Sequence, residues 1–188
     1  MFSIRETSIP GCIEIQPIVR EDFRGSFVKV FQEPEFRKLG LETNFREEYY
    51  TTSQRNVIRG MHFQTPPFDH VKLIYCTDGS VFDVAVDIRR NSPHFGRFTS
   101  IQLSKENGNA IYIPRGFAHG FFVTSASATL VYKVSAVHSP EHDQGILWNS
   151  LDIPWPSERP LISDRDRKLP RLVDFDSPFL YGNSANTS

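Results

Sequence analysis

The chain has 188 residues, which is enough for one domain with a sizeable core and too few for two ordinary domains. Hydrophobic residues make up 39% and charged residues 23%, a globular balance that excludes a disordered chain. The formal net charge is −1, so the overall charge favours neither nucleic acid nor an acidic membrane as a partner.

Three further features of the sequence bear on the cellular location of the protein. No apolar run approaches the roughly 20 residues of a membrane span, and residues 1–6 lack the basic start and apolar stretch of a signal peptide. Cys12 and Cys76 are too few for a disulfide framework. We therefore expect a cytoplasmic protein with a single domain over residues 1–188.

In chain order, the pattern predicts an edge strand within residues 1–20, a turn over 22–25, a strand over 26–31 and a short helix over 34–40. Strands follow over 47–53, 57–64, 71–77, 80–89, 95–104, 110–113, 119–124 and 129–135, with a hairpin turn at Asp78-Gly79. The segment from Ser150 onward is rich in Pro, Asp and Arg and predicts turns with a short helix. About ten short strands at regular spacing predict an all-β fold, a jelly-roll barrel or sandwich with a few short helices.

One predicted strand is apolar on both faces. Residues 81–88 are all hydrophobic except Asp83 and Asp87. A strand buried on both sides has this composition, so its two acids need buried partners or belong to a site.

Histidines in a jelly roll first suggest a metal-binding cupin, whose ligands include a His-x-His pair on one strand. Here His62 is followed by Phe63 and Gln64, so the pair is broken. We expect neither a metal nor a dissociable cofactor, and a metal-dependent cupin oxygenase stays an alternative.

Alternation along residues 59–64 predicts Arg59, Met61 and Phe63 on one strand face, with His62 on the other face between Gly60 and Gln64. If the second face lines the barrel, His62 is a candidate base; the alternative is an ordinary core histidine. Lys72 either reaches the rim or points a cation into the cavity. Tyr132 and His119 are ambiguous in the same way. Each is either a residue of the cavity or an ordinary structural residue, in the core for Tyr132 and in a turn for His119.

Seven segments of the chain together carry a family resemblance. They are residues 59–64, 72–73, 81–89, 92–96, 113–121, 132–133 and 146–149. In this order and spacing they resemble the dTDP-4-keto-6-deoxyglucose (dTDP-4-dehydrorhamnose) 3,5-epimerase family of nucleotide-sugar enzymes. The resemblance covers residues 3–172, which it implies are the core of the domain, and leaves residues 173–188 as a C-terminal tail. The resemblance implies a cupin-like jelly roll, a homodimer with exchanged strands, and a nucleotide-diphosphate 4-keto-6-deoxy sugar as substrate, with neither nucleic acid nor membrane as a partner.

The family reaction inverts carbon centres beside a C4 ketone in deoxysugar biosynthesis. It needs a base, a group that stabilises the enolate, and a proton donor on the opposite face. By resemblance, His62 is the base, Asp166 its carboxylate partner, Lys72 the cation at the enolate oxygen and Tyr132 the acid. The resemblance further implies substrate contacts from Arg24, Phe27, Lys29, Glu47, Tyr49, Arg59, His119, His138, Asp143 and Arg167.

The chain departs from the family pattern on the nucleotide side. A family Glu becomes Lys29, the family Gln-x-Asn pair becomes Glu47-Glu48-Tyr49, a double Tyr becomes Val137-His138, and a further Glu becomes Asp143. Lys can only donate hydrogen bonds, which suits cytosine better than the N–H of thymine. We therefore hypothesise retained proton chemistry with a CDP- or GDP-linked sugar. The alternatives are a single-site epimerase, a 3,4-ketoisomerase, and a non-catalytic sugar-binding jelly roll.

Overall fold

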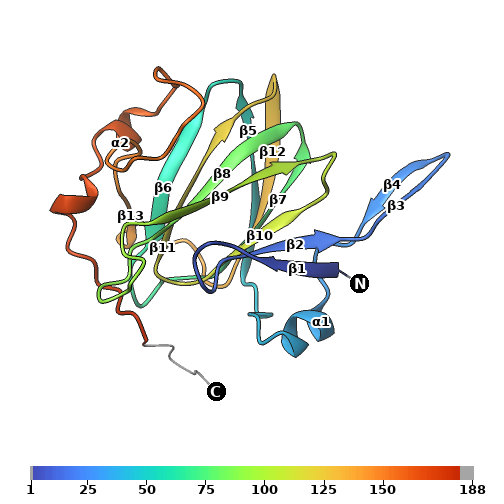
Figure 1. Ribbon diagram of the computed structural model, residues 1–188, viewed down its shortest axis with the longest axis horizontal. Helices are drawn as coiled ribbons and strands as arrows, with labels where there is room; N and C mark the ends of the chain where they lie inside the picture. The colour runs from blue at the N-terminus through green and yellow to red at the C-terminus, as the bar shows by residue number, and fades with distance from the viewer. Residues whose placement is uncertain (1, 183–188) are drawn as a thin grey trace.

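Two antiparallel sheets lie face to face and enclose the main core (Figure 1). The structure is a computed structural model that describes residues 2–182; residues 183–188, the end of the predicted tail, lie outside the described residues. One sheet has the strand order β1-β2-β10-β7-β12-β5 and the other β13-β6-β11-β8-β9. The predicted all-β jelly roll is confirmed.

The bounds of the elements follow the chain. The strands are β1 Phe2–Glu6, β2 Ile13–Pro17, β3 Val19–Asp22, β4 Gly25–Val28, β5 Glu47–Gln54, β6 Ile58–Gln64, β7 Lys72–Asp78, β8 Ser80–Asp87, β9 Phe98–Ser104, β10 Ala110–Ile113, β11 Phe117–Val123, β12 Ser127–Val134 and β13 Asp143–Gly145. The helices are α1 Glu33–Lys38, α2 Asp164–Arg167 and the 3₁₀ turn η1 Leu172–Asp174.

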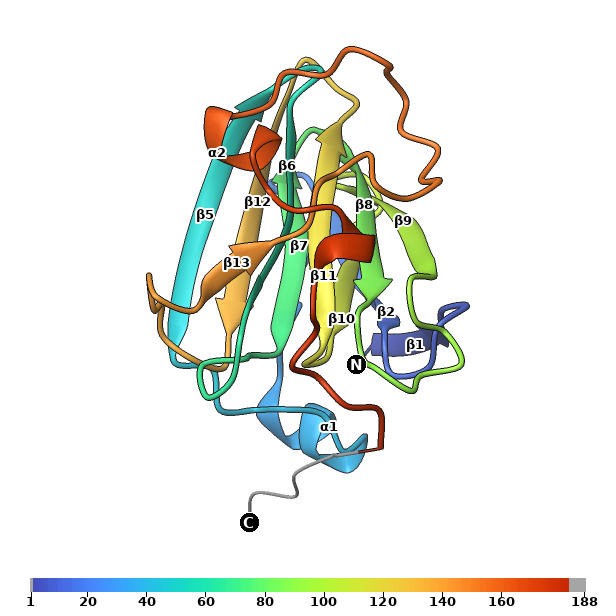
Figure 2. The same cartoon turned by 90° about the vertical axis from the view of Figure 1, so that its left-hand side faces the viewer.

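Strand β8 is buried on both faces, as its composition predicts. Val81 and Ala85 pack into the core between the sheets, whereas Val84 and Val86 face a second core on the outer side. That second core is covered by the C-terminal segment, which runs across the five-stranded sheet (Figure 2). Both faces of β8 are therefore closed to water, which explains the nearly continuous apolar run.

The outer face of the six-stranded sheet is covered in the same way near the N-terminus. Phe36 of α1 is fully buried and packs edge-on against Phe2 and Phe31. The helix begins with a proline in its first turn and has acidic residues there and basic residues in its last turn, which favours a helix in this short segment. The predicted helix over 34–40 is confirmed with a shift of one or two residues.

The N-terminal region differs from the prediction of one edge strand. Residues 2–17 form two strands, because the turn around Pro10-Gly11 folds β1 back onto β2 in an antiparallel pair. Gly11 adopts φ +91°, a conformation that glycine enters without strain. The structure therefore has more strands than the ten expected. One of the additional strands is β13, which the sequence pattern did not indicate.

Strands β3 and β4 form a hairpin that projects from the body (Figure 1). The predicted turn at residues 22–25 lies at its tip, where Phe23 is 98% exposed. Phe27 is also exposed, at 59%. The hairpin thus presents aromatic rings to solvent away from the two sheets.

A bulge in β6 shifts the phase of its side chains. His62 pairs with His119 and Arg59 with Phe121, so two residues of β6 stand opposite the single residue Gly120. The predicted alternation is therefore wrong here: Arg59 and His62 line the same cavity. A Cβ on Gly60, at φ +142°, would lie 2.5 Å from the Gly120 Cα, so the two strands approach more closely than a side chain permits.

In the described part of the chain, no helix has both the length and the apolar character that crossing a bilayer requires.

The bulge yields a stability prediction. Gly60→Ala combines a positive φ with a backbone clash, and we expect it to lower the free energy of unfolding by about 2–4 kcal/mol. Gly40→Ala is the matched control, because Gly40 has φ +68° but open space around its Cβ position. The control should lose only about 1–2 kcal/mol. Urea unfolding measures both variants, and equal losses would contradict the close approach.

Candidate active site

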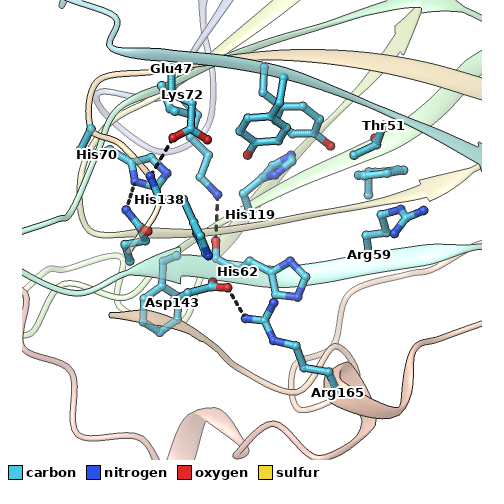
Figure 3. Close-up of a pocket in the computed structure, with 17 residues that line it drawn as sticks. Glu47, Thr51, Arg59, His62, His70, Lys72, His119, His138, Asp143 and Arg165 are labelled. Atoms are coloured by element: carbon cyan, nitrogen blue, oxygen red, sulfur yellow. Dashed lines mark hydrogen bonds and ion pairs between the residues drawn. The ribbon is translucent and has the colours of Figure 1, made fainter. Parts of the chain in front are cut away.

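A cavity of about 320 Å³ opens between the two sheets (Figure 3). Strands β5, β7 and β12 form one wall, and β6, β11 and β13 form the other. The lining residues are Glu47, Tyr49, Thr51, Arg59, His62, Phe63, Gln64, His70, Lys72, His119, Phe121, Tyr132, Val134, Ala136, His138, Asp143 and Arg165.

His62 is held from behind by a carboxylate. Its Nε2 lies 2.8 Å from Oδ1 of Asp166, and Asp166 also accepts from the backbone N–H of Gly60. Burial raises the pKa of Asp166, but the hydrogen bond from His62 and the other donors outweigh it, so the net pKa lies below its usual range. An ionised carboxylate only accepts, which makes Nε2–H the donor and leaves Nδ1 of a neutral ring to take a proton.

Lys72 places an ammonium group inside the cavity. The side chain is buried, and its Nζ donates to the backbone oxygen of His62 at 3.1 Å. Burial lowers the pKa of Lys72 to about 8, and the negative charges of Asp143 and Asp83 limit the drop. The group is therefore mostly a cation near neutral pH. Of the two interpretations of Lys72, the one with the cation in the cavity holds.

Tyr132 stands on the wall opposite His62, and its ring is enclosed by two others. The Tyr49 ring is stacked on it at a centroid distance of 4.7 Å, and the His119 ring meets it edge-on at 6.0 Å. Burial raises the pKa of Tyr132 well above its usual value. Its phenol therefore stays protonated at neutral pH.

His119 is fixed by the buried Asp83, one of the two acids that the sequence predicts to need a partner. Its Nε2 lies 2.9 and 3.1 Å from the two oxygens of Asp83. Burial lowers the pKa of His119 more than Asp83 raises it, so the ring is neutral near pH 7. The other acid, Asp87, pairs with Arg89 and Ser92 outside the cavity.

Polar groups at the rim are linked in pairs. Arg59 Nε donates to Ser53 at 2.9 Å, and Glu47 accepts from the backbone N–H of His138 at 2.7 Å. Asp143 forms a 2.9 Å ion pair with Arg165 at one side of the cavity (Figure 3). The rim therefore carries two cationic side chains, Arg59 and Arg165, and each is held by a hydrogen bond or ion pair to a neighbouring residue.

The structure brings together most of the residues that the sequence singles out. Nine of them line the cavity: His62, Lys72, Tyr132, Glu47, Tyr49, Arg59, His119, His138 and Asp143. Asp166 stands directly behind His62. Arg24, Phe27 and Lys29 lie on or beside the projecting β3–β4 hairpin, and Arg167 does not line the cavity. In α2, Arg165 lines the cavity in its place.

Sequence reasoning missed several lining residues, among them Thr51, His70 and Arg165. Thr51 follows Glu47 and Tyr49 at strand period on β5, so alternation could have indicated it. His70 lies in a loop without periodicity. Burial and the Lys72 cation lower the pKa of His70 to about 3. No signal in the sequence placed His70 near the site.

The described residues contain no group of three or more His, Cys, Asp or Glu side chains arranged to hold a metal ion.

Comparison with known proteins assigns the family. The family model described as dTDP-4-dehydrorhamnose 3,5-epimerase matches residues 6–174. The chain belongs to the dTDP-4-dehydrorhamnose 3,5-epimerase family. It is therefore an enzyme of the epimerase class, as the resemblance implied.

Relatives of this epimerase family match over most of the chain. The dTDP-4-dehydrorhamnose 3,5-epimerase of Shigella flexneri is 41% identical, covering 93% of this chain and 98% of its own. The crystal structure of the Legionella pneumophila 3,5-epimerase in complex with dTDP-4-keto-L-rhamnose has a TM-score of 0.90 at 37% identity, covering 94% of this chain and 95% of its own. A 3′-monoepimerase of Streptomyces bikiniensis in complex with dTDP-quinovose has a TM-score of 0.85 at 32% identity, covering 89% and 86%. The expected cupin-like jelly roll is confirmed by these epimerase structures.

Proposed function

We propose that the protein epimerises a nucleotide-linked 4-keto-6-deoxy sugar at C3, C5 or both, by proton transfer next to the C4 ketone. The observation that carries this proposal is the arrangement of three groups around one cavity. His62 stands on one wall, Tyr132 on the other, and the Lys72 ammonium lies between the sheets. The deoxysugar epimerases named among the relatives support the substrate class.

The first step is removal of the proton on the carbon next to the ketone. Nδ1 of His62 takes this proton, and the C–H electron pair moves to the ketone oxygen, which gives an enolate. Asp166 holds Nε2–H and stabilises the imidazolium that forms. Lys72 faces the negative oxygen, and a fixed charge shielded from water stabilises it more strongly than a solvated one.

The second step is return of a proton from the opposite side. The Tyr132 hydroxyl gives its proton to the enolate carbon, the electron pair returns from oxygen to form the new C–H bond, and a phenolate remains. The phenolate then regains a proton from solvent, and the imidazolium of His62 loses one. Because base and acid stand on opposite walls, the carbon is inverted.

Deuterium uptake in heavy water tests this proposal. We expect the protein to label the carbons that it inverts, two for a 3,5-epimerase and one for a single-site epimerase. His62→Ala should abolish uptake, lowering it by about 10³-fold or more because no base remains, while binding of the nucleoside diphosphate is retained. Mass spectrometry and NMR of the recovered sugar give the readout.

His94→Ala is the control for this experiment, because His94 lies in a loop outside the cavity lining. It should take up deuterium at the wild-type rate. Binding without any uptake by the wild-type protein would support the sugar-binding jelly roll instead.

The pKa of Lys72 predicts the alkaline limb of the pH profile. As pH rises through about 8, the ammonium loses its proton and the enolate loses its counter-charge, so kcat/KM should fall about tenfold per unit at higher pH. Lys72→Arg should move this limb upward, since a guanidinium stays charged. Lys72→Met should lower kcat by about 10²–10³-fold at all pH values. A wild-type profile that is flat to about pH 10 would contradict the assignment.

The nucleotide has two candidates. A thymidine diphosphate is the first, because the similar structures bind dTDP-linked ligands. A cytidine or guanosine diphosphate is the second, favoured by Lys29 and Glu47. Lys29 only donates, and Glu47 accepts from His138 with lone pairs of its carboxylate left over for an exocyclic amino group.

Titration with dTDP, CDP and GDP separates these candidates. If Lys29 and Glu47 contact the base, CDP or GDP should bind about tenfold more tightly than dTDP, the size of one lost hydrogen bond. Lys29→Glu should reverse this order. Lys105→Glu makes the same charge change on an exposed turn and should leave it unchanged. Clear preference for dTDP would remove the second candidate.

The projecting hairpin supports a homodimer with exchanged strands. Its exposed Phe23 and Phe27 suit contact with a second copy, and Arg24 at its tip is a suitable group for a diphosphate. In such a dimer, Arg24, Phe27 and Lys29 reach the cavity of the partner subunit. The homodimer and the cytoplasmic location both stay predictions.

A further inference from the structure

Tyr49, for which the family resemblance implies a substrate contact, lines the cavity. Its ring is also stacked on Tyr132 at 4.7 Å with an interplanar angle of 12°. The contact follows from strand register. Tyr49 of β5 pairs directly with Tyr132 of β12, and opposite residues of an antiparallel pair share one face of the sheet.

The stack covers the side of the Tyr132 ring that faces the sheet edge. Among the described residues of this chain, β5 is the last strand of its sheet, with no further strand beyond Tyr49. Within the cavity, the His119 ring meets Tyr132 edge-on, and His119 is itself fixed by two contacts with Asp83. Tyr132 is therefore enclosed between an immobilised histidine and Tyr49, and only Tyr49 is partly exposed, at 39%.

The angle of Tyr132 matters for the proposed reaction. A phenol hydroxyl lies far from the bond about which the side chain turns, so a rotation of about 10–20° moves it by an ångström or more. A misplacement of about 1 Å can cost about 100-fold in rate. The ring that limits this rotation thus influences whether the proton reaches the enolate carbon.

We propose that Tyr49 is a positioning residue that holds the Tyr132 phenol in line with the enolate and so sets how often the enolate is protonated with inversion. This inference rests on the proposed function. An enolate that Tyr132 fails to protonate takes a proton back from His62, on the face it left. His62 is 27% exposed and exchanges its proton with solvent, so in heavy water this return gives labelled sugar of unchanged configuration.

The experiment measures a ratio in heavy water. A nucleotide-linked 4-keto-6-deoxyhexose is incubated with the wild-type protein, Tyr49→Ala, Tyr49→Phe and Tyr50→Ala. NMR compares deuterium in the inverted product with deuterium in the recovered, uninverted sugar. The ratio is independent of the fraction of active protein, so partial loss of folding does not change it.

We expect Tyr49→Ala to lower the ratio of inversion to non-inverting exchange by about tenfold or more, with total exchange within about threefold of wild type. Tyr49→Phe keeps the stacked ring and should keep the wild-type ratio of inversion to non-inverting exchange. Tyr50→Ala removes a neighbouring ring that is 72% exposed and should also leave the ratio unchanged.

Two results would overturn the inference. If Tyr49→Ala lowers inversion and exchange equally, the stack only stabilises the sheet. If Tyr49→Phe lowers the ratio as much as Tyr49→Ala does, the hydroxyl of Tyr49 acts directly. Absence of any deuterium uptake by the wild-type protein is a different outcome, because it contradicts the proposed function itself.

Discussion

The site depends on a close approach between two strands. Where β6 passes β11, Gly60 and Gly120 leave no room for a Cβ on either side, since a Cβ on Gly120 would lie 2.6 Å from the sulfur of Met61. The approach accommodates the extra residue of the bulge, and the bulge brings Arg59 and His62 to one face. Without it, strand alternation would point one of them away from the cavity. The chemistry of the cavity thus begins with two residues that have no side chain.

Charge in the cavity is balanced by acids at several depths. Asp166 supports His62 from behind, Asp83 holds His119 at the base, and Asp143 pairs with Arg165 at the rim. Lys72 stays mostly cationic although it is buried, because Asp143 and Asp83 oppose the effect of burial on its pKa. The acids therefore keep a cation on a side chain that is itself buried.

Composition and local sequence pattern predicted the features that depend on a single strand. The apolar run of β8 indicated burial on both faces and pointed to Asp83 and Asp87. Both acids have partners, the buried His119 for Asp83 and the half-buried Arg89 for Asp87. Patterns could not predict features that depend on a neighbouring strand. The phase of Arg59 depends on Gly120 across the sheet, and β13 forms its three-residue strand by pairing with β6. The stacking of Tyr49 is of the same kind, since it depends on register with Tyr132.

The place of β5 at the sheet margin bears on how such a site diversifies. An edge strand has a single neighbour, so substitutions along it require little accommodation elsewhere in the barrel. Glu47 and Tyr49, for which the resemblance implies substrate contacts, both lie on this strand. His62 and Lys72, in contrast, lie on strands with neighbours on both sides. The architecture thus separates a tolerant margin from a constrained interior, so substitutions on β5 can alter the cavity wall while the groups that we propose for proton transfer stay in place.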